Sequence, residues 1–397
     1  MSESTQFVKS DLLPEMVYNR CFCEAGSREF VEFESVNVEA LESVPMDSEK
    51  PWECYRVKVV VRFSGEPKTF PLIVKLLSPS IRSENAFARF QNEEMFYSKM
   101  VSVYGKENFS ECYLSDLGRY GMPVIVLEDL IAAGYETVQR KLNEDELKLC
   151  LESLAKFHAK GLRLKAEKFE VFREFYAKLL ETTFDEESIP QKKDKKRIHV
   201  SLRDSSLAEE VVKAFGSNPL ETARRACMEI NDVSCICHGA FSRGKMLFRR
   251  DEKNARPIDG RMIDWQTMRY CSPAIDLGAI LLTNFPAFSV VDMESSSSPA
   301  RSFLQEMLTY YVDAVKREYP VITCERLKEE IVSVLPDTLP YVVLSCREDF
   351  TDERSIETLA VCSRTFPSLG SGTIVVRYGW LVSAASFRGK PLHSELF

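Results

Sequence analysis

A single lysine lies inside an almost wholly apolar strand, and this feature constrains the fold most. The segment Phe70–Leu77 reads Phe-Pro-Leu-Ile-Val-Lys-Leu-Leu, so Lys75 is its one charged residue. A buried ammonium group is costly unless a carboxylate pairs with it. The helix that follows offers one, because Glu93 shares a face with Phe90 and Tyr97. The alternative is a lysine and a glutamate that both reach solvent.

The first third of the chain reads as a sheet with one helix. Apolar and polar residues alternate over 31–40, and a slip in their phase predicts a β-bulge near Ser35. A cleaner alternation covers 55–63, and a short apolar run at 123–127 predicts a buried strand. The helix that carries Glu93 is expected over 86–100.

Helical patterns dominate the rest of the chain. Asn143 is expected to cap a long helix with a buried stripe that reaches His158. The other expected helices cover 169–180, 207–215, 302–317 and 325–335. Residues 185–197 are rich in charge and predict a surface loop, and 294–299 predict a flexible connection.

One small β segment interrupts the helical part. Residues 233–237 form an apolar strand that leads into the loop 238–245. Residues 246–248 and 261–264 then flank a polar turn, as the two arms of a hairpin would. The second arm ends at Asp264, and a carboxylate at a strand end is a common place for a metal ligand.

Charge and hydropathy narrow the class of protein. The 397 residues carry 52 Lys and Arg against 60 Asp and Glu, a net charge of −8, which disfavours a nucleic-acid partner. The start shows no secretory signal, and the most apolar stretch, 277–291, contains Gly278 and Pro286 and is too short to span a bilayer. These features favour a cytoplasmic protein without a membrane partner.

Cysteine usage agrees with a reducing compartment. Twelve cysteines are too few for a disulfide scaffold in a chain of this length. Two close pairs, Cys21 with Cys23 and Cys235 with Cys237, suggest a metal site, but zinc ligands more often have a two-residue spacer. Small buried residues are the preferred interpretation.

Five motifs in a fixed order resemble a known family. They are Phe90-x-x-Glu93-x-x-Phe96-Tyr97, Val126-Leu-Glu-Asp-Leu130, Leu154-Ala-x-Phe-His158-Ala159, Cys237-His238-Gly239, and Ile263-Asp-Trp-Gln266 with Pro273-Ala-Ile-Asp276-Leu277. From about residue 30 to about 340, the chain is similar to the ecdysteroid-kinase-like family, or CHK kinase-like domain, itself similar to choline kinases and aminoglycoside phosphotransferases. The resemblance implies an α+β, two-lobed protein-kinase-like fold.

The same resemblance implies a domain layout. Residues 1–127 would form the N-lobe, 128–133 the hinge and 134–397 the helical C-lobe. The catalytic loop and the metal-site hairpin would lie within 233–266. ATP and Mg²⁺ are the cofactors that the family implies, and a small hydroxylated, steroid-like molecule is the implied partner. The oligomeric state is left open.

Carried over by position, the family's roles fall on seven residues. Lys75 would contact the nucleotide phosphates and Glu93 would anchor that lysine. The hinge residues Glu128 and Leu130 would flank the adenine. In a second group, Asp264 would ligate magnesium, His238 would brace the catalytic loop, and Asp276 would hold the backbone of that loop, a structural role.

Two positions depart from the family pattern of His-Gly-Asp followed by Asn. Ala240 stands at the catalytic aspartate position and Lys245 at the asparagine position. Alanine cannot accept a proton, and an ammonium group cannot ligate magnesium. The phosphate-covering loop, 43–53, contains two prolines and no glycine, so its backbone cannot easily approach a phosphate.

Three hypotheses follow. In the first, the chain is a pseudokinase, or a strongly impaired small-molecule kinase, that binds a ligand or a partner between the lobes. In the second, it is an active ATP-dependent phosphotransferase acting on a steroid-like alcohol, with Lys245 replacing a magnesium charge and a carboxylate such as Asp232 serving as base. In the third, the chain is a sequestering protein with no nucleotide site left. Lys75 and Glu93 also have a structural interpretation, as a buried ion pair that holds the lobes together.

Overall fold

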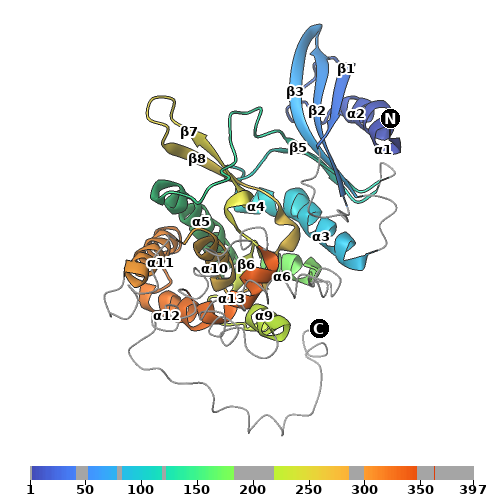
Figure 1. Cartoon of the computed structure of the whole chain (residues 1–397). Coiled ribbons are helices and arrows are strands. Elements are labelled where there is room, and N and C mark those ends of the chain that lie inside the picture. Colours follow the sequence, from blue (N-terminus) through green and yellow to red (C-terminus); the bar gives the residue numbers. More distant parts are fainter. Residues whose placement is uncertain are drawn as a thin grey trace, which may run out of the picture.

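An antiparallel sheet of five strands forms one end of the molecule (Figure 1). The computed structural model describes residues 2–41, 52–77, 83–118, 122–182, 219–285, 299–346 and 362. The strands lie in the order β1-β2-β3-β5-β4. Their bounds are Val31–Ala40 (β1), Trp52–Phe63 (β2), Glu66–Leu77 (β3), Cys112–Asp116 (β4) and Val124–Glu128 (β5). The central strand is β3, which carries Lys75.

Strand pairing confirms two sequence predictions. The register of β1 against β2 shifts between Phe33 and Ser35, where the slip in phase predicted a bulge. On β3, Lys75 lies opposite Cys54 of β2 and Ile125 of β5, so the lysine belongs to the middle of the sheet. Most of the glycine-free loop, 42–51, lies outside the described residues.

One face of the sheet is covered by helical segments at the start of the chain. These are α1 (Glu3–Phe7), the π-helical turn η1 (Val8–Leu12) and α2 (Leu13–Tyr18). Their apolar side chains pack against Val57 and Val59 of β2 in one buried cluster. The prediction of a single helix in the first third is therefore wrong. The residues 8–17 carry apolar side chains at helical spacing, and only the sheet supplies the surface that buries them.

The opposite face packs on the helix that carries Glu93. It runs through α3 (Glu84–Met95), the π-helical turn η2 (Phe96–Met100) and α4 (Val101–Tyr104) without a break. The Ser83 hydroxyl caps its start by accepting a hydrogen bond from the Ala86 amide. The prediction over 86–100 is confirmed, with two more residues at the start and four more at the end.

The second part of the molecule is mainly helical (Figure 1). Asn143 and Glu146 form a capping box at the start of the long helix α5, as the pattern predicted. The helices are α5 (Glu144–Glu167), α6 (Phe169–Lys178), α9 (Pro219–Met228), α10 (Ala274–Thr283), α11 (Pro299–Glu318), α12 (Cys324–Val334) and α13 (Thr338–Ser345). Those predicted at 169–180, 302–317 and 325–335 are confirmed. The helix predicted at 207–215, the charged loop at 185–197 and all but one residue of the connection at 294–299 lie outside the described residues.

Two short ladders cross this helical part. Strand β6 (Cys235–Cys237) pairs with β9 (Arg269–Cys271), and β7 (Met246–Arg250) pairs with β8 (Pro257–Met262). The predicted hairpin is confirmed, but its second strand is β8, which ends at Met262, two residues before Asp264. Across all described residues, no helix is both long enough and apolar enough to cross a membrane.

Candidate functional site

Lys75 and Glu93 form a buried ion pair between the sheet and α3. The Lys75 ammonium donates a hydrogen bond to the Glu93 carboxylate, and the two residues are 8% and 3% exposed. Burial alone would lower the pKa of Lys75, but the carboxylates of Glu93 and Asp264 outweigh it and raise this pKa. Lys75 therefore stays charged at neutral pH, and the pairing that the sequence indicated is present.

An aromatic ring covers the same lysine. The Lys75 Nζ lies 4.5 Å from the centroid of the Trp52 ring, a cation–π contact. Trp52 begins β2 and shares a face of that strand with Cys54, which lies opposite Lys75. The sequence analysis missed this contact. The alternation of β2 places Trp52 on that face, but only the register with β3 brings it to Lys75.

Asp264 follows β8 in a left-handed backbone conformation, with φ 69° and ψ 64°. Such a conformation is uncommon outside glycine, although aspartate tolerates it better than most residues. The next residue, Trp265, is fully buried and stacks on Phe96 of η2 at 3.8 Å between ring centroids. This stack ties the segment that carries Asp264 to the helix that carries Glu93.

Two ammonium groups face the Asp264 carboxylate. Lys245 donates a hydrogen bond to Oδ2, and the Lys75 Nζ lies 4.0 Å from Oδ1. Burial would raise the pKa of Asp264, but Lys245 and Lys75 hold it well below its ordinary value. Burial would lower the pKa of Lys245, and Asp264 raises it instead. Both partners of the Lys245–Asp264 pair are therefore ionised at neutral pH.

The loop after β6 is held from below by Asp276. This carboxylate accepts hydrogen bonds from the amides of His238 at 2.7 Å and Gly239 at 2.8 Å. Gly239 has a φ of +89°, and a Cβ at this position would overlap the Thr267 carbonyl oxygen, so the loop requires glycine here. These contacts order the loop backbone, and the family role of Asp276 stays a prediction.

His238 links this loop to the segment before Asp264. Its Nε2 donates to the Ile263 carbonyl at 2.9 Å, and its Nδ1 lies 3.4 Å from the Ala240 amide, which donates to it. Burial lowers the pKa of His238, so the ring is neutral in the fold. Both ring nitrogens are used within the loop, as expected for a bracing residue rather than a proton donor to a ligand.

Asp232 does not replace the side chain missing at Ala240. Ala240 is 7% exposed and offers no side-chain oxygen. Asp232, considered above as an alternative base, precedes β6, whereas Ala240 lies beyond the other end of that strand. The Asp232 carboxylate pairs with Arg326 of α12, and its side chain is 71% exposed. The hypothesis that Asp232 serves the catalytic loop is therefore wrong.

The segment after β5 connects the sheet to the helical part. The Asp129 carboxylate accepts a hydrogen bond from Arg56 Nε of β2 at 2.7 Å. Leu130 is buried against Tyr135 and Leu247, with Ile263 at the edge of this small apolar cluster. The Glu128 carboxylate lies 3.4 Å from the Glu111 amide, which donates to it. Adenine contacts at Glu128 and Leu130, and phosphate contacts at Lys75, stay predictions.

A cluster of His158, Cys235 and Cys237 lies beneath the loop. Their ligand atoms lie within 4.8 Å of one another, and all three residues are buried. Both nitrogens of the His158 ring already have partners, namely Asp276 at 3.1 Å and the Tyr311 hydroxyl at 2.8 Å. A metal would have to displace one of them. We therefore interpret Cys235 and Cys237 as core residues, in line with the sequence analysis, whereas Cys21 and Cys23 are only half-buried.

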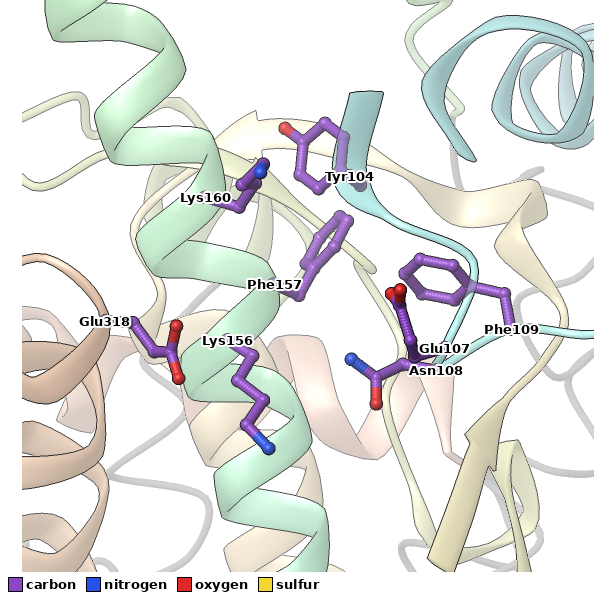
Figure 2. Close-up of a pocket in the computed structure, with 8 residues that line it drawn as sticks. All are labelled: Tyr104, Glu107, Asn108, Phe109, Lys156, Phe157, Lys160 and Glu318. Carbon is purple, nitrogen blue, oxygen red and sulfur yellow. The ribbon is translucent and has the colours of Figure 1, made fainter. Parts of the chain in front are cut away.

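A separate hollow lies against α5 (Figure 2). Its volume is about 180 Å³. Its lining residues are Tyr104, Glu107, Asn108, Phe109, Lys156, Phe157, Lys160 and Glu318. None of the residues that surround Asp264 lines this hollow, and it plays no part in the site described above.

Magnesium, which the resemblance implies, does not fit the residues present. Mg²⁺ takes a nearly octahedral set of oxygen ligands and gives up its bound water reluctantly. Asp264 offers oxygens, but both face ammonium groups. Ala240 and Lys245, at the two positions where the family pattern has Asp and Asn, offer no ligand oxygen.

Solved structures with a similar fold share little sequence with the chain. The GDP complex of an aminoglycoside 2′-phosphotransferase is 12% identical with a TM-score of 0.39, covering 88% of this chain and 96% of that one. An ethanolamine kinase of Plasmodium vivax is 12% identical with a TM-score of 0.38, and the match covers 80% of this chain and 81% of that kinase. A choline/ethanolamine kinase family protein of Mesorhizobium loti is 14% identical with a TM-score of 0.34, and the match covers 85% of this chain and 93% of that protein.

A family model supplies the assignment. No curated protein matches the chain. The model of the ecdysteroid kinase-like family matches residues 53–317, a narrower range than the 30–340 expected from the motifs. The matched range runs from β2 into α11 and includes Lys75, Glu93, Asp264 and Asp276. The antiparallel sheet followed by a helical lobe confirms the predicted protein-kinase-like fold, and the chain belongs to the ecdysteroid kinase-like family.

Proposed function

We propose that this protein is a pseudokinase that binds a small hydroxylated, steroid-like molecule between its two lobes. The lobes would comprise residues 1–127 and 134–397, joined at 128–133. The observation that carries the proposal is the contact between Lys245 and Asp264, beside a loop with alanine at position 240. The side chain left to hold a metal is bound to an ammonium group, and the side chain that would accept a proton is missing.

The magnitudes favour loss of activity. General base catalysis typically contributes about 10²–10⁴-fold to the rate, and the alanine removes it. Metal ions add several kcal/mol of charge stabilisation in phosphoryl transfer, and this too is lost when Asp264 is occupied. Positioning by the intact scaffold would leave a residual reaction at most.

The parts that remain serve to shape a binding site. Asp276 still orders the loop backbone, and the Trp265–Phe96 stack still joins the two lobes. The apolar cluster of Leu130, Tyr135 and Leu247 lies next to Ile263, the residue before Asp264. An apolar surface beside a few charged groups suits a ligand with a fused ring skeleton and hydroxyl groups.

Binding is tested directly with an ecdysteroid and with cholesterol as probes. Native mass spectrometry of the purified protein, followed by titration with each probe, measures the affinity. We expect Ile263→Gln to weaken binding, because an amide would replace the partly buried apolar side chain next to Asp264. Ile258→Gln is the matched control, since Ile258 is 56% exposed on the neighbouring strand β8. Equal affinity of both variants would contradict the location of the site.

Catalysis is tested by the transfer of the ATP γ-phosphate to the same two alcohols. We expect no product from the wild type. The double variant Ala240→Asp/Lys245→Asn should also stay far below an active kinase, because the loop 43–53 still lacks glycine. Wild-type turnover that disappears in Asp264→Ala would establish the alternative, an active phosphotransferase with unusual residues.

A further inference from the structure

We infer that Lys245 takes the place of a divalent cation on Asp264, so that binding in this cleft needs no Mg²⁺. The inference rests on the proposed function, because it concerns the same site. It makes a separate claim, however, since a pseudokinase can either keep or lose its metal. Four charged groups, Lys75, Glu93, Lys245 and Asp264, carry the argument.

The backbone places Lys245 beside Asp264. Lys245 ends the 3₁₀ turn η3 (Arg243–Lys245) at the start of β7. Its carbonyl accepts a hydrogen bond from the Ile263 amide at 3.0 Å, so the two chain segments are paired one residue before Asp264. The side chains of Lys245 and Asp264 are only 31% and 18% exposed. The contact is therefore part of the fold rather than a chance encounter of two surface side chains.

The charges in the site already balance. Lys75 and Lys245 contribute two positive charges, and Glu93 and Asp264 contribute two negative charges. With asparagine at position 245, the same group would carry a net charge of −1, which attracts a divalent cation. With lysine, a divalent cation would meet two ammonium groups and no excess negative charge, so it is repelled.

Lys245 can also contact a ligand in place of the metal. An ammonium group has three N–H donors, and one of them points to Asp264. The remaining donors suit an oxygen of a bound molecule, either a phosphate or a hydroxyl. Because Asp264 holds the ammonium in position, such a contact does not depend on a bound ion.

Manganese serves as the metal probe and ATP as the nucleotide probe. Electron paramagnetic resonance counts free Mn²⁺ during titration of the wild type and of Lys245→Asn, with and without ATP. We expect no Asp264-dependent Mn²⁺ binding in the wild type. Lys245→Asn should bind Mn²⁺ at least about tenfold more tightly, because one positive charge is removed at contact distance and an amide oxygen is added.

Three further variants make the result specific. The gain in Mn²⁺ affinity should vanish in Lys245→Asn/Asp264→Asn, which removes the carboxylate. Lys245→Met should gain less than Lys245→Asn, since methionine removes the charge without adding an oxygen. Lys148→Asn, at an exposed pair with Glu144, should gain nothing. If Lys245→Asn is not folded by circular dichroism, Lys245→Gln replaces it.

Thermal unfolding supplies the second measurement. For the wild type, the shift in melting temperature with ATP should be the same in Mg²⁺ and in EDTA. Either a larger shift with Mg²⁺ or wild-type Mn²⁺ binding that Asp264→Asn abolishes would overturn the inference. So would the absence of any gain in Lys245→Asn. Phosphoryl transfer in EDTA would overturn the pseudokinase proposal alone and leave this inference standing.

Discussion

The buried pair of Lys75 and Glu93 allows a quantitative test of how the two lobes are held together. Lys75→Met would leave the Glu93 carboxylate, whose side chain is 4% exposed, without its contacting ammonium. Breaking a buried ion pair by removing one partner typically costs about 3–5 kcal/mol, because a charge stays buried without compensation. Glu93→Met should cost less than Lys75→Met, because Asp264 lies 4.0 Å from the Lys75 ammonium and compensates part of its charge.

The double variant should cost less than either single one. Replacing both members of a buried pair with apolar residues is often neutral or even stabilising. In Lys75→Met/Glu93→Met the second substitution removes the charge that the first left unpaired. The two substitutions should therefore show a coupling free energy of about 3 kcal/mol or more in a double-mutant cycle. Lys245 keeps its hydrogen bond to Asp264 in all four proteins, while the contact between Lys75 and Asp264 is lost in both variants that replace Lys75.

Urea unfolding followed by circular dichroism measures the free energy of unfolding of all four proteins. A loss of 3 kcal/mol lowers the urea midpoint by about 1 M or less, because the slope of the free energy against urea concentration increases with protein size. The matched control is the exposed pair Lys148 and Glu144, whose removal should change the stability by less than about 1 kcal/mol. Additive effects of the two single substitutions at the buried pair would refute the reasoning.

Two further predictions concern the loop after β6. Asp276→Asn should destabilise the protein by about 3–5 kcal/mol, because an amide cannot replace a carboxylate that accepts hydrogen bonds from two backbone amides and contacts His158. A melting temperature equal to that of the wild type within error would contradict this prediction. Burial lowers the pKa of His238 in the folded protein. The neutral ring therefore contributes stability above about pH 6.5, the ordinary pKa of histidine in an unfolded chain, and this stability is lost as the pH falls below that value. The stability difference between wild type and His238→Gln should therefore shrink between pH 7 and pH 5, by up to about 1.4 kcal/mol per pH unit, and a difference that grows instead would show that the folded ring is charged.

Local pattern predicted much of the architecture. The alternation in β1, the bulge at Ser35, the cap at Asn143 and the hairpin before Asp264 all depend on residues close together in the chain. Their physical causes, namely side-chain period and backbone capping, act over a few residues. The pairing of Lys75 with Glu93 also followed, because a buried charge in a strand leaves few alternatives.

Other features escaped prediction because they depend on packing between distant segments. The helices α1 and α2 are short, and they gain their stability from the face of the sheet. Trp52 reaches Lys75 only through the register of β2 against β3. Asp232 looked available as a base in sequence, yet it lies before β6, away from the loop that follows this strand, and pairs with α12.

The sequence by itself determined the order of the motifs, the family and the chemistry missing at Ala240, since these depend only on residue identity. It also showed that Lys245 cannot ligate a metal. What this lysine does instead was decided by the tertiary structure. The pairing of Ile263 with Lys245 brings an ammonium group onto Asp264, and electrostatics between groups 19 residues apart can be read only once the chain is folded.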